Sequence, residues 1–141
     1  MTHATTLVIR EEAHLTDPAH ADANALLPLT PTVFHILLAL ADGEKHGYAI
    51  MQEVEAHTQG AMRLGPGTLY GSIQRMVKDG LLTKAPERVD PAQGEERRRY
   101  YRLTGFGQRV MVAEAHRLEQ LVDMAHQKHV LPGLGTAGGT A

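Results

Sequence analysis

The sequence contains no cysteine and no tryptophan, and only six of its 141 residues are aromatic. The lack of cysteine excludes a disulfide scaffold, thiol catalysis and cysteine-ligated zinc, and it fits a reducing cytoplasm. No apolar run approaches the ~20 residues that a membrane-spanning helix needs. The first residues do not combine a basic start with a long apolar stretch. We therefore expect no signal peptide, no membrane partner and a cytoplasmic protein.

The charge of the chain is unevenly distributed, although the formal net charge is only -2. Residues 1–62 carry two basic and eight acidic side chains, residues 63–102 carry nine basic and five acidic ones, and residues 103–141 carry three of each. A local positive patch can bind phosphate groups even when the whole molecule is acidic. Basic solvated faces are also common in proteins of other functions, so charge alone does not decide between the two interpretations.

Proline and glycine punctuation predicts three helices and a hairpin in the middle of the chain. The predicted elements are helices over residues 30–43, 46–57 and 66–80, an extended segment from residue 81, a loop over 86–96 and a returning strand over 97–103. Three helices followed by a hairpin is the order of a winged helix-turn-helix. We therefore predict a mainly α fold with a small β-hairpin wing.

The remaining sequence predicts an arm, a long helix and a tail. In the arm, residues 5–9 are typical of a strand and residues 18–27 of a short helix. The predicted divisions are an N-terminal arm (1–28), a winged helix-turn-helix DNA-binding domain (29–103), a C-terminal dimerisation helix (104–129) and a flexible tail (130–141). Met111, Ala115, Leu118, Val122, Ala125 and His129 recur at heptad-like spacing on the last helix, with Val110, Leu121 and Met124 beside them. This broad apolar face predicts a homodimer, although one helix that covers its own core would show the same pattern.

The third predicted helix is amphipathic. Leu69, Ile73, Met76 and Val77 fall at i, i+4, i+7 and i+8, so they share one face. The opposite face carries Thr68, Gly71, Gln74, Arg75 and Lys78, with Ser72 beside it. Such side chains suit a helix in the DNA major groove, where Gln pairs with adenine and Arg with guanine. An ordinary surface helix with mixed polar residues is the alternative.

The returning strand is rich in arginine. Arg97, Arg99 and Tyr101 alternate with Arg98, Tyr100 and Arg102, so arginines point outward whichever face is buried. Arginine is favoured in narrow minor grooves and along the phosphate backbone, which is where a wing beside a recognition helix lies. The two tyrosines are expected in the core or at its rim rather than as platforms for stacked bases.

Four linked motifs resemble the PadR family of bacterial transcriptional regulators. They are HGYAI (46–50), PGTLYGSIQRM (66–76), DGLL (79–82) and RRRYYRLTGFG (97–107), and their order and spacing agree over roughly residues 29–107. The resemblance implies a winged helix-turn-helix dimer that represses transcription, with the C-terminal helix building the dimer. The single helix after the wing is similar to the short subgroup of the family.

The resemblance also assigns site residues. Residues 66–70 match the start of the family's recognition helix, His46 and Tyr48 match residues near the DNA backbone, and residues 97–99 match the wing. Gly65 departs from the pattern, because a serine that caps the helix is common there, and Met62 and Arg63 lie where a tryptophan is common. The residues expected to contact DNA are His46, Tyr48, Pro66, Gly67, Thr68, Tyr70, Gly71, Ser72, Gln74, Arg75, Lys78, Arg97, Arg98 and Arg99.

Three further expectations concern the last helix. The dimer interface is expected to contain Met111, Ala115, Leu118, Leu121, Val122 and Ala125. Because many family members are relieved by small molecules near that interface, the expected effector pocket is lined by Phe34, Leu37, Leu38, Met111, Leu118 and Val122, a set that also describes plain core. Glu114, His116, His126 and His129 would give four zinc ligands across an antiparallel dimer, and solvent-exposed helix histidines are the alternative.

The functional prediction is a sequence-specific regulator that binds a pseudo-palindromic operator on double-stranded DNA. We expect a homodimeric repressor released by a small-molecule effector, with no cofactor. The alternatives are a protein–protein docking module on a winged-helix scaffold and a metal-responsive repressor that uses His116, His126 and His129. The sequence offers no convincing nucleophile–base pair or paired carboxylates, so we do not expect an enzyme.

Overall fold

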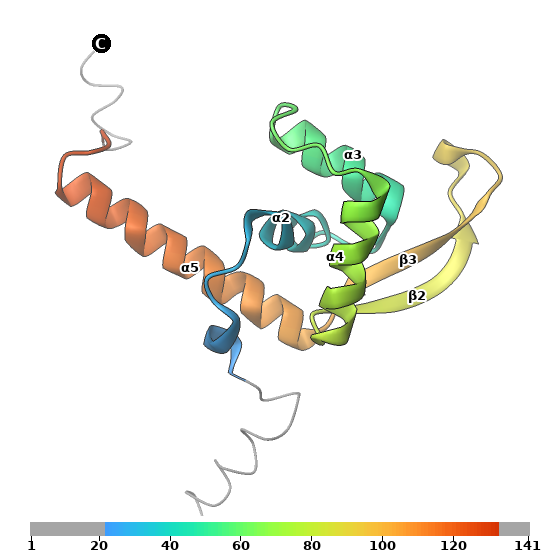
Figure 1. Cartoon of the computed structure of the whole chain (residues 1–141), viewed down its shortest axis with the longest axis horizontal. Helices are drawn as coiled ribbons and strands as arrows, with labels where there is room; N and C mark the ends of the chain where they lie inside the picture. The colour runs from blue at the N-terminus through green and yellow to red at the C-terminus, as the bar shows by residue number, and fades with distance from the viewer. Residues whose placement is uncertain (1–21, 133–141) are drawn as a thin grey trace, which may run out of the picture.

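The computed structural model describes residues 22–132 (Figure 1). The strand predicted over residues 5–9 and most of the predicted tail lie outside this part of the chain. Of the short helix predicted over residues 18–27, the described part contains the 3-10 helix η2 (Ala23–Leu26), which is capped by Asp22. No helix among residues 22–132 is long and apolar enough to cross a membrane.

Three helices form the body, as the sequence predicts. They are α2 (Pro31–Ala39), α3 (Gly47–His57) and α4 (Pro66–Lys78). Thr30 caps α2, because its Oγ1 accepts the Val33 N–H at 3.3 Å. The prediction that α2 continues to Gly43 is wrong, since its C-cap is already Leu40. Gly80 ends α4 as predicted, with a φ of +81° that favours glycine.

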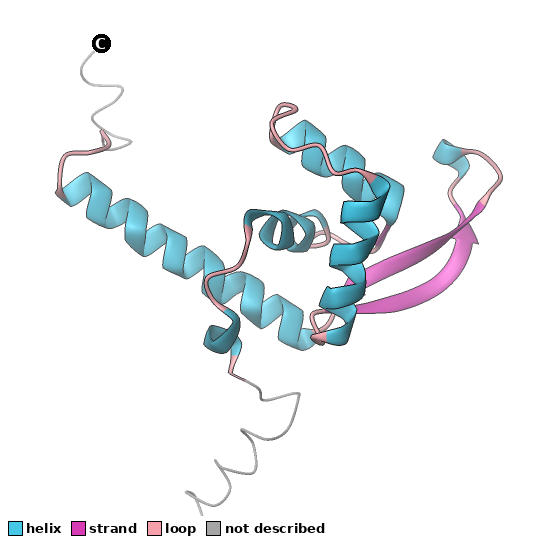
Figure 2. Cartoon of the chain, in the orientation of Figure 1, coloured by secondary structure: helices cyan, strands magenta, loops and turns pink. Residues whose placement is uncertain are grey.

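The sheet has three antiparallel strands in the order β1-β3-β2. They are β1 (Lys45–His46), β2 (Leu82–Val89) and β3 (Arg97–Leu103). The prediction of a loop from residue 86 is wrong, because β2 continues to Val89. Pro86 lies where the register shifts between Ala85 and Arg88, and β2 is an edge strand, so the missing N–H is tolerated. The hairpin leaves the body beside α4 (Figures 1 and 2).

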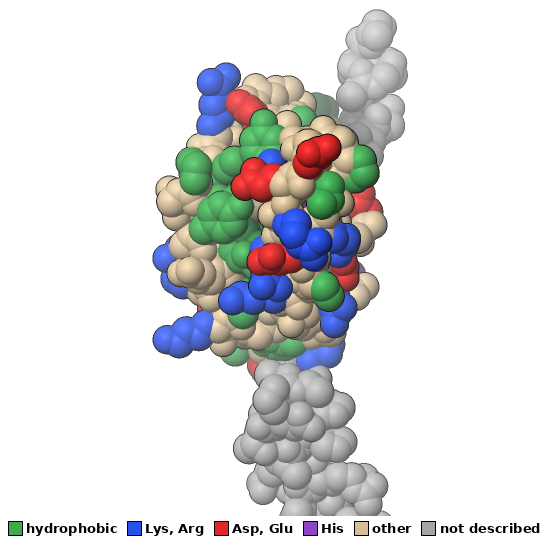
Figure 3. Space-filling view, turned by 90° about the vertical axis from the view of Figure 1, so that its right-hand side faces the viewer, with side chains coloured by type: hydrophobic (Ala, Val, Ile, Leu, Met, Phe, Trp, Pro, Cys, Tyr) green, Lys and Arg blue, Asp and Glu red, His purple; other side chains and the backbone are tan. Residues whose placement is uncertain are grey.

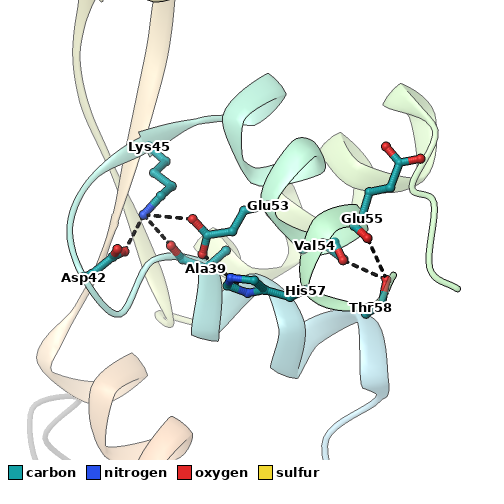
Figure 4. A network of polar contacts seen from close by, with 8 residues as sticks. All are labelled: Ala39, Asp42, Lys45, Glu53, Val54, Glu55, His57 and Thr58. Carbon is teal, nitrogen blue, oxygen red and sulfur yellow. Dashed lines mark hydrogen bonds and ion pairs between the residues drawn. The ribbon is translucent and has the colours of Figure 1, made fainter. Parts of the chain in front are cut away.

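The turn between α2 and α3 is held by a polar network around Lys45 (Figure 4). Its Nζ donates to the Ala39 carbonyl oxygen at 2.7 Å and to the Asp42 carboxylate, and it lies 3.5 Å from Glu53 Oε1. The ammonium group therefore joins the end of α2 to the middle of α3.

The core lies between the three body helices, the sheet and the first half of α5 (Gly105–Gln127). Its fully buried members are Ile36, Leu37, Ile50, Val54, Leu69, Ile73, Met76, Leu82 and Val110. Helix α5 begins where predicted, because Thr104 Oγ1 accepts the Gly107 N–H at 2.9 Å. The second half of α5 extends away from the body (Figure 1), which leaves its apolar side chains exposed.

Candidate nucleic-acid interface

The two faces of α4 separate as the sequence pattern predicts. Leu69, Ile73 and Met76 are buried and Val77 is half-buried, whereas the outer side chains of Thr68, Tyr70, Gln74, Arg75 and Lys78 are exposed. Basic residues occur in the last turn of this helix and no acidic residue occurs in the first. The outer face is therefore polar and without negative charge, as a helix that enters a groove of DNA requires.

Ser72 is an exception to this separation of the two faces. It was expected beside the outer face, but it is only 3% exposed. Arg75 Nη2 donates to its hydroxyl at 3.4 Å, and both residues line a cleft of about 200 Å³ together with Leu29 and Val33. Residues 26–33 cover this flank of α4, so Ser72 is not accessible to DNA.

The start of α4 is open, as the departure at Gly65 predicts. Gly65 is the N-cap and makes no side-chain cap hydrogen bond. A Cβ at Gly65 or Gly67 would meet nothing within 4 Å. The N–H groups of the first turn and the positive end of the helix dipole therefore face open space, where a phosphate group can approach.

His46 does not occupy the exposed place near DNA that the resemblance implies. It is 1% exposed, and its Nδ1 accepts the Ala49 N–H at 3.1 Å, so it caps α3. Its Nε2 lies 2.8 Å from Asp90 Oδ2. The hydrogen bond from His46, followed by that from the Ala92 N–H, lowers the pKa of the Asp90 carboxyl. The assignment of His46 as a direct DNA contact is therefore wrong.

The neighbours of His46 separate into a packing residue and an exposed one. A Cβ at Gly47 would lie 2.3 Å from Tyr70 Oη, so the Tyr70 ring packs directly on the backbone of α3 in a place that a larger residue would force it to leave. Tyr48 is 39% exposed, and the Arg98 guanidinium lies 5.5 Å from its ring centroid, within the range of a cation–π contact. Tyr48 remains accessible, while Gly47 is a packing contact between α3 and α4.

The wing arginines are partly held by acceptors of the protein itself. Arg97 Nη2 donates to the Glu87 carbonyl oxygen, and Arg99 Nη1 donates to the Ala85 carbonyl oxygen, each at 3.1 Å. Arg99 also pairs with the Glu87 carboxylate at 3.3 Å. The Arg98 side chain is more buried, and its Nε is without a hydrogen-bond partner. On this end of the molecule, Lys and Arg side chains gather with acidic ones among them (Figure 3).

Two further arginines of the hairpin were not among the residues expected to contact DNA. Arg88 and Arg102 share the Glu44 carboxylate, with N···O distances of 3.0 and 3.5 Å. Arg88 also stacks over Tyr100, 3.5 Å from the ring centroid. The alternation of residues in the returning strand could have identified Arg102 as an outward-facing arginine. Arg88 could not be identified in this way, because Pro86 led to the prediction of a loop where β2 continues.

Both wing tyrosines are buried, as expected for core or rim residues. Tyr101 joins the hydrophobic core, and burial raises the pKa of its phenol. Tyr100 lies on the opposite face of β3, with its ring centroid 5.3 Å from that of His46. Strand β3 is central in the sheet and covered on both sides at this point, so neither ring is available to stack on a base.

The expected effector lining does not form one surface. Leu37 lies within the core and has no exposed surface, whereas Leu38 is among the exposed apolar residues. Phe34 is half-buried and Met111 packs against the core. Leu37 was therefore wrongly assigned to the pocket lining, while a pocket formed by the other residues at a dimer interface stays a prediction.

The four expected metal ligands interact with other groups of the protein or lie far from one another. Glu114 is 2% exposed and accepts hydrogen bonds from Arg117 and from the Leu29 N–H. His116 lies 3.8 Å from Glu119, and His126 Nδ1 lies 3.2 Å from the Leu131 carbonyl oxygen. Within residues 22–132, no three His, Asp or Glu side chains lie close enough to hold a metal ion. Glu114 is a buried structural group, so its assignment as a zinc ligand is wrong.

The expected dimer residues fall into two sets. Leu118, Leu121 and Val122 are exposed large apolar side chains, and Met124 and Val112, which were not in the expected set, are exposed as well. Ala115 is exposed and Ala125 is half-buried. Met111 instead packs against the core of its own chain.

The fold and this polar end of the molecule define a winged helix-turn-helix protein with a long additional helix. Residues 36–113, more than half of the chain, match the Transcriptional regulator PadR-like family. The chain belongs to this family, which confirms the resemblance seen in the four motifs. The family consists of transcriptional regulators, so the expectation that the protein is not an enzyme is confirmed as well.

Relatives extend this assignment. The chain is 38% identical over 87 residues to the transcriptional regulator Rv3488 of Mycobacterium tuberculosis, a match that covers 62% of this chain and 75% of that protein. It is also 38% identical over 89 residues to a 37.1 kDa transposon protein of Streptomyces fradiae, where the match covers 61% of this chain but only 22% of the relative.

Solved structures show the same fold. A transcriptional regulator from Clostridium thermocellum superposes with a TM-score of 0.55 at 26% identity, over 68% of this chain and 87% of the other. PadR of Bacillus subtilis in complex with operator DNA superposes with a TM-score of 0.51 at 20% identity, over 61% of this chain and 47% of the other.

Proposed function

We propose that the protein is a sequence-specific DNA-binding repressor in which α4 enters the major groove and the hairpin contacts backbone or minor groove. The observation that carries the proposal is the pairing of two surfaces on one side of the body. The outer face of α4 is polar and without acidic residues, and the arginine-bearing hairpin leaves the body beside it. The Bacillus subtilis structure, which shares this fold, contains operator DNA, and this supports DNA as the partner.

Each part of this interface has a distinct role. Gln74 and Arg75 are exposed and are proposed to read base edges, while Thr68, Lys78 and the first-turn N–H groups hold phosphates. Tyr48, Arg97 and Arg99 are proposed to contact the DNA backbone beside the helix. In the free protein, Glu87 and backbone oxygens offset the charges of the two arginines, and phosphate oxygens would replace these acceptors on binding.

The proposed active form is a homodimer built by α5. The exposed row of Leu118, Leu121, Val122 and Met124 supports it, because apolar residues at heptad-like spacing favour pairing with a second helix. Two copies related by a twofold axis would present their α4 helices to half-sites about 34 Å apart on a pseudo-palindrome.

Release by a small molecule is part of the proposal. The cleft of about 200 Å³ on the flank of α4 supports it, because an occupant there would touch Arg75, which is proposed to read a base, and the Ser72 hydroxyl that accepts a hydrogen bond from it. Thermal-shift screening of small amphipathic compounds tests this part. The expected hit raises the melting temperature and lowers DNA affinity. Stabilising compounds that leave DNA affinity unchanged would contradict it.

The test of DNA binding uses a duplex selected from a random pool by the purified protein, with affinity measured by fluorescence anisotropy over a range of salt concentrations. Arg97→Ala and Arg99→Ala should weaken all duplexes and each flatten the salt dependence by about one phosphate contact. Gln74→Ala and Arg75→Ala should change sequence preference instead. Lys128→Ala, at the far end of α5, is the matched control.

A result in which all four interface variants bind as the wild type does would contradict the proposed interface. Salt-sensitive binding with no sequence preference would favour the alternative of a docking module with a generic basic surface.

A further inference from the structure

The histidine at the start of α3 connects this helix to the wing. His46 pairs with Tyr100 across β1 and β3, but β1 contains only two residues. Such a short strand contributes few hydrogen bonds, so side chains add to the connection: His46 at the start of α3, and Glu44 through its ion pairs with Arg88 and Arg102. Its imidazole is buried, caps α3 through Nδ1 and meets Asp90 through Nε2.

The two hydrogen bonds fix the tautomer of His46. Nδ1 accepts the Ala49 N–H, so it carries no proton, and the proton of the neutral ring is on Nε2. Nε2–H then donates to Asp90 Oδ2 over 2.8 Å. Asn, Asp or Ser at this position would cap the helix, but each is too short to reach Asp90 from the same place.

Asp90 lies where the wing turns. It follows the last residue of β2, and its other oxygen, Oδ1, accepts the Ala92 N–H at 3.0 Å. One carboxylate oxygen thus shapes the β2–β3 loop, and the other is held by the first turn of α3. Gln93 of the same loop adds a weaker contact, since its Nε2 lies 3.3 Å from Gln52 Oε1 on α3.

The start of α3 also contacts α4. The close approach of Gly47 to Tyr70 joins the start of α3 to the first turn of α4. Adjacent residues therefore contact the two halves of the interface, with His46 toward the wing and Gly47 toward α4. The start of α3 thus contacts both the β2–β3 loop and α4, and it contributes to their relative position beside the direct packing of α4 on β2.

We propose that His46 and Asp90 are positioning residues for DNA binding, which hold the wing in register with α4 without contacting DNA themselves. The inference rests on the proposed function, because it assumes that the wing arginines contact DNA. Loss of the His46–Asp90 hydrogen bond lets the hairpin change its angle to α4. The wing contacts then become partly lost, while the α4 contacts remain.

Two variants break this hydrogen bond and keep the local caps. His46→Asn retains an oxygen that can cap α3, and Asp90→Ser retains one that can accept the Ala92 N–H. Asp42→Ser is the control for a lost carboxylate, because it also removes one carboxylate and one ion pair, while Lys45 keeps its contacts with Ala39 and Glu53 and the His46–Asp90 hydrogen bond is untouched. It therefore corrects for the gain in DNA affinity that any lost negative charge produces.

Affinity for the selected duplex is measured by anisotropy at several salt concentrations, at a temperature where circular dichroism shows every variant to be folded. Asp90→Ser should weaken binding about 5- to 20-fold relative to Asp42→Ser, and His46→Asn should weaken it by a similar factor relative to the wild type, as loss of one or two charge-assisted contacts would. The salt dependence should become shallower. Added to either variant, Arg97→Ala should cost less than it does in the wild type.

The outcomes separate the two proposals. If Arg97→Ala and Arg99→Ala weaken the wild type but His46→Asn and Asp90→Ser change only the melting temperature, the pair has a structural role alone and the inference is overturned. If the arginine variants also bind normally, the wing does not contact DNA, and the proposed role of the wing fails together with the inference. Reduced affinity with an unchanged salt dependence would also overturn it.

Discussion

Glu114 gives the most quantitative prediction about stability, because it joins two segments that are far apart in the sequence. Its side chain is 2% exposed on α5, and Oε2 accepts the Leu29 N–H at 2.9 Å. Arg117, one turn along α5, donates from Nη2 to the same oxygen at 3.1 Å and from Nε to Oε1. The carboxylate therefore holds the segment before α2 against the long helix.

Glu114→Ala should destabilise the protein by about 2 to 3 kcal/mol, because the partly buried Leu29 N–H loses its acceptor and a small cavity forms at the buried Glu114 side chain. Glu114→Gln should cost less, since it keeps an oxygen for Leu29 and loses only the charge. The surface part of the Arg117 interaction is screened by solvent and adds little. A loss of this size lowers the melting temperature by about 5 to 10 °C in a chain of this length.

The pH dependence follows from the direction of the pKa shift. The hydrogen bond from Arg117, and then that from Leu29, lowers the pKa of Glu114 below its ordinary value of 4.5. The contribution of Glu114 is therefore fully present above the pKa of the unfolded chain, and it is lost as the pH falls through the lower folded value. The difference between wild type and Glu114→Gln should shrink below pH 4.

The assay is urea denaturation followed by circular dichroism at pH 7 and pH 3, with Glu119→Ala as the control. Glu119 lies on the same helix and its side chain is 70% exposed, so its removal should change the free energy of unfolding by less than about 0.5 kcal/mol. If Glu114→Ala and Glu119→Ala cost the same at pH 7, the buried carboxylate does not hold the two segments together and the reasoning is wrong.

Three further substitutions test the packing. Gly107→Ala should lower the free energy of unfolding by about 3 kcal/mol in denaturant titration, because its Cβ would lie 2.0 Å from the Leu81 carbonyl oxygen. Gly105→Ala has room for a Cβ and should be nearly neutral. Equal effects of the two substitutions would contradict this packing. Ile73→Ala should cost about 2 to 5 kcal/mol as a core truncation, and a cost below 1 kcal/mol would show that α4 packs less closely. Gly47→Ala should lower stability through Tyr70, and Tyr70→Ala should remove most of that added cost in a double-mutant cycle.

Local rules predicted the helices well. The apolar spacing of α4 identified its buried face, and the Thr30–Pro31 and Thr104 caps marked true helix starts. These features depend on neighbours within one or two turns, which a single sequence displays. The order of three helices and a hairpin then led to the correct fold class.

The errors have a common physical origin in contacts between distant segments. Ser72 lies on the flank of the apolar face of α4 and is buried because residues 26–33 cover it. Glu114 is held by Leu29, 85 residues earlier in the chain. His46 matched a family motif, but its contact with Asp90 depends on how the wing turns. No periodicity or local spacing contains this information.

The most direct test of the central claim is selection of binding sites from a pool of random duplexes by the wild-type protein at near-physiological salt, followed by sequencing. The account predicts enrichment of a pseudo-palindrome with two half-sites about one helical turn apart, and a changed preference at one position of each half-site for Gln74→Ala or Arg75→Ala. A pool that stays unenriched while the protein binds it in a salt-sensitive manner would contradict the claim that α4 reads DNA sequence.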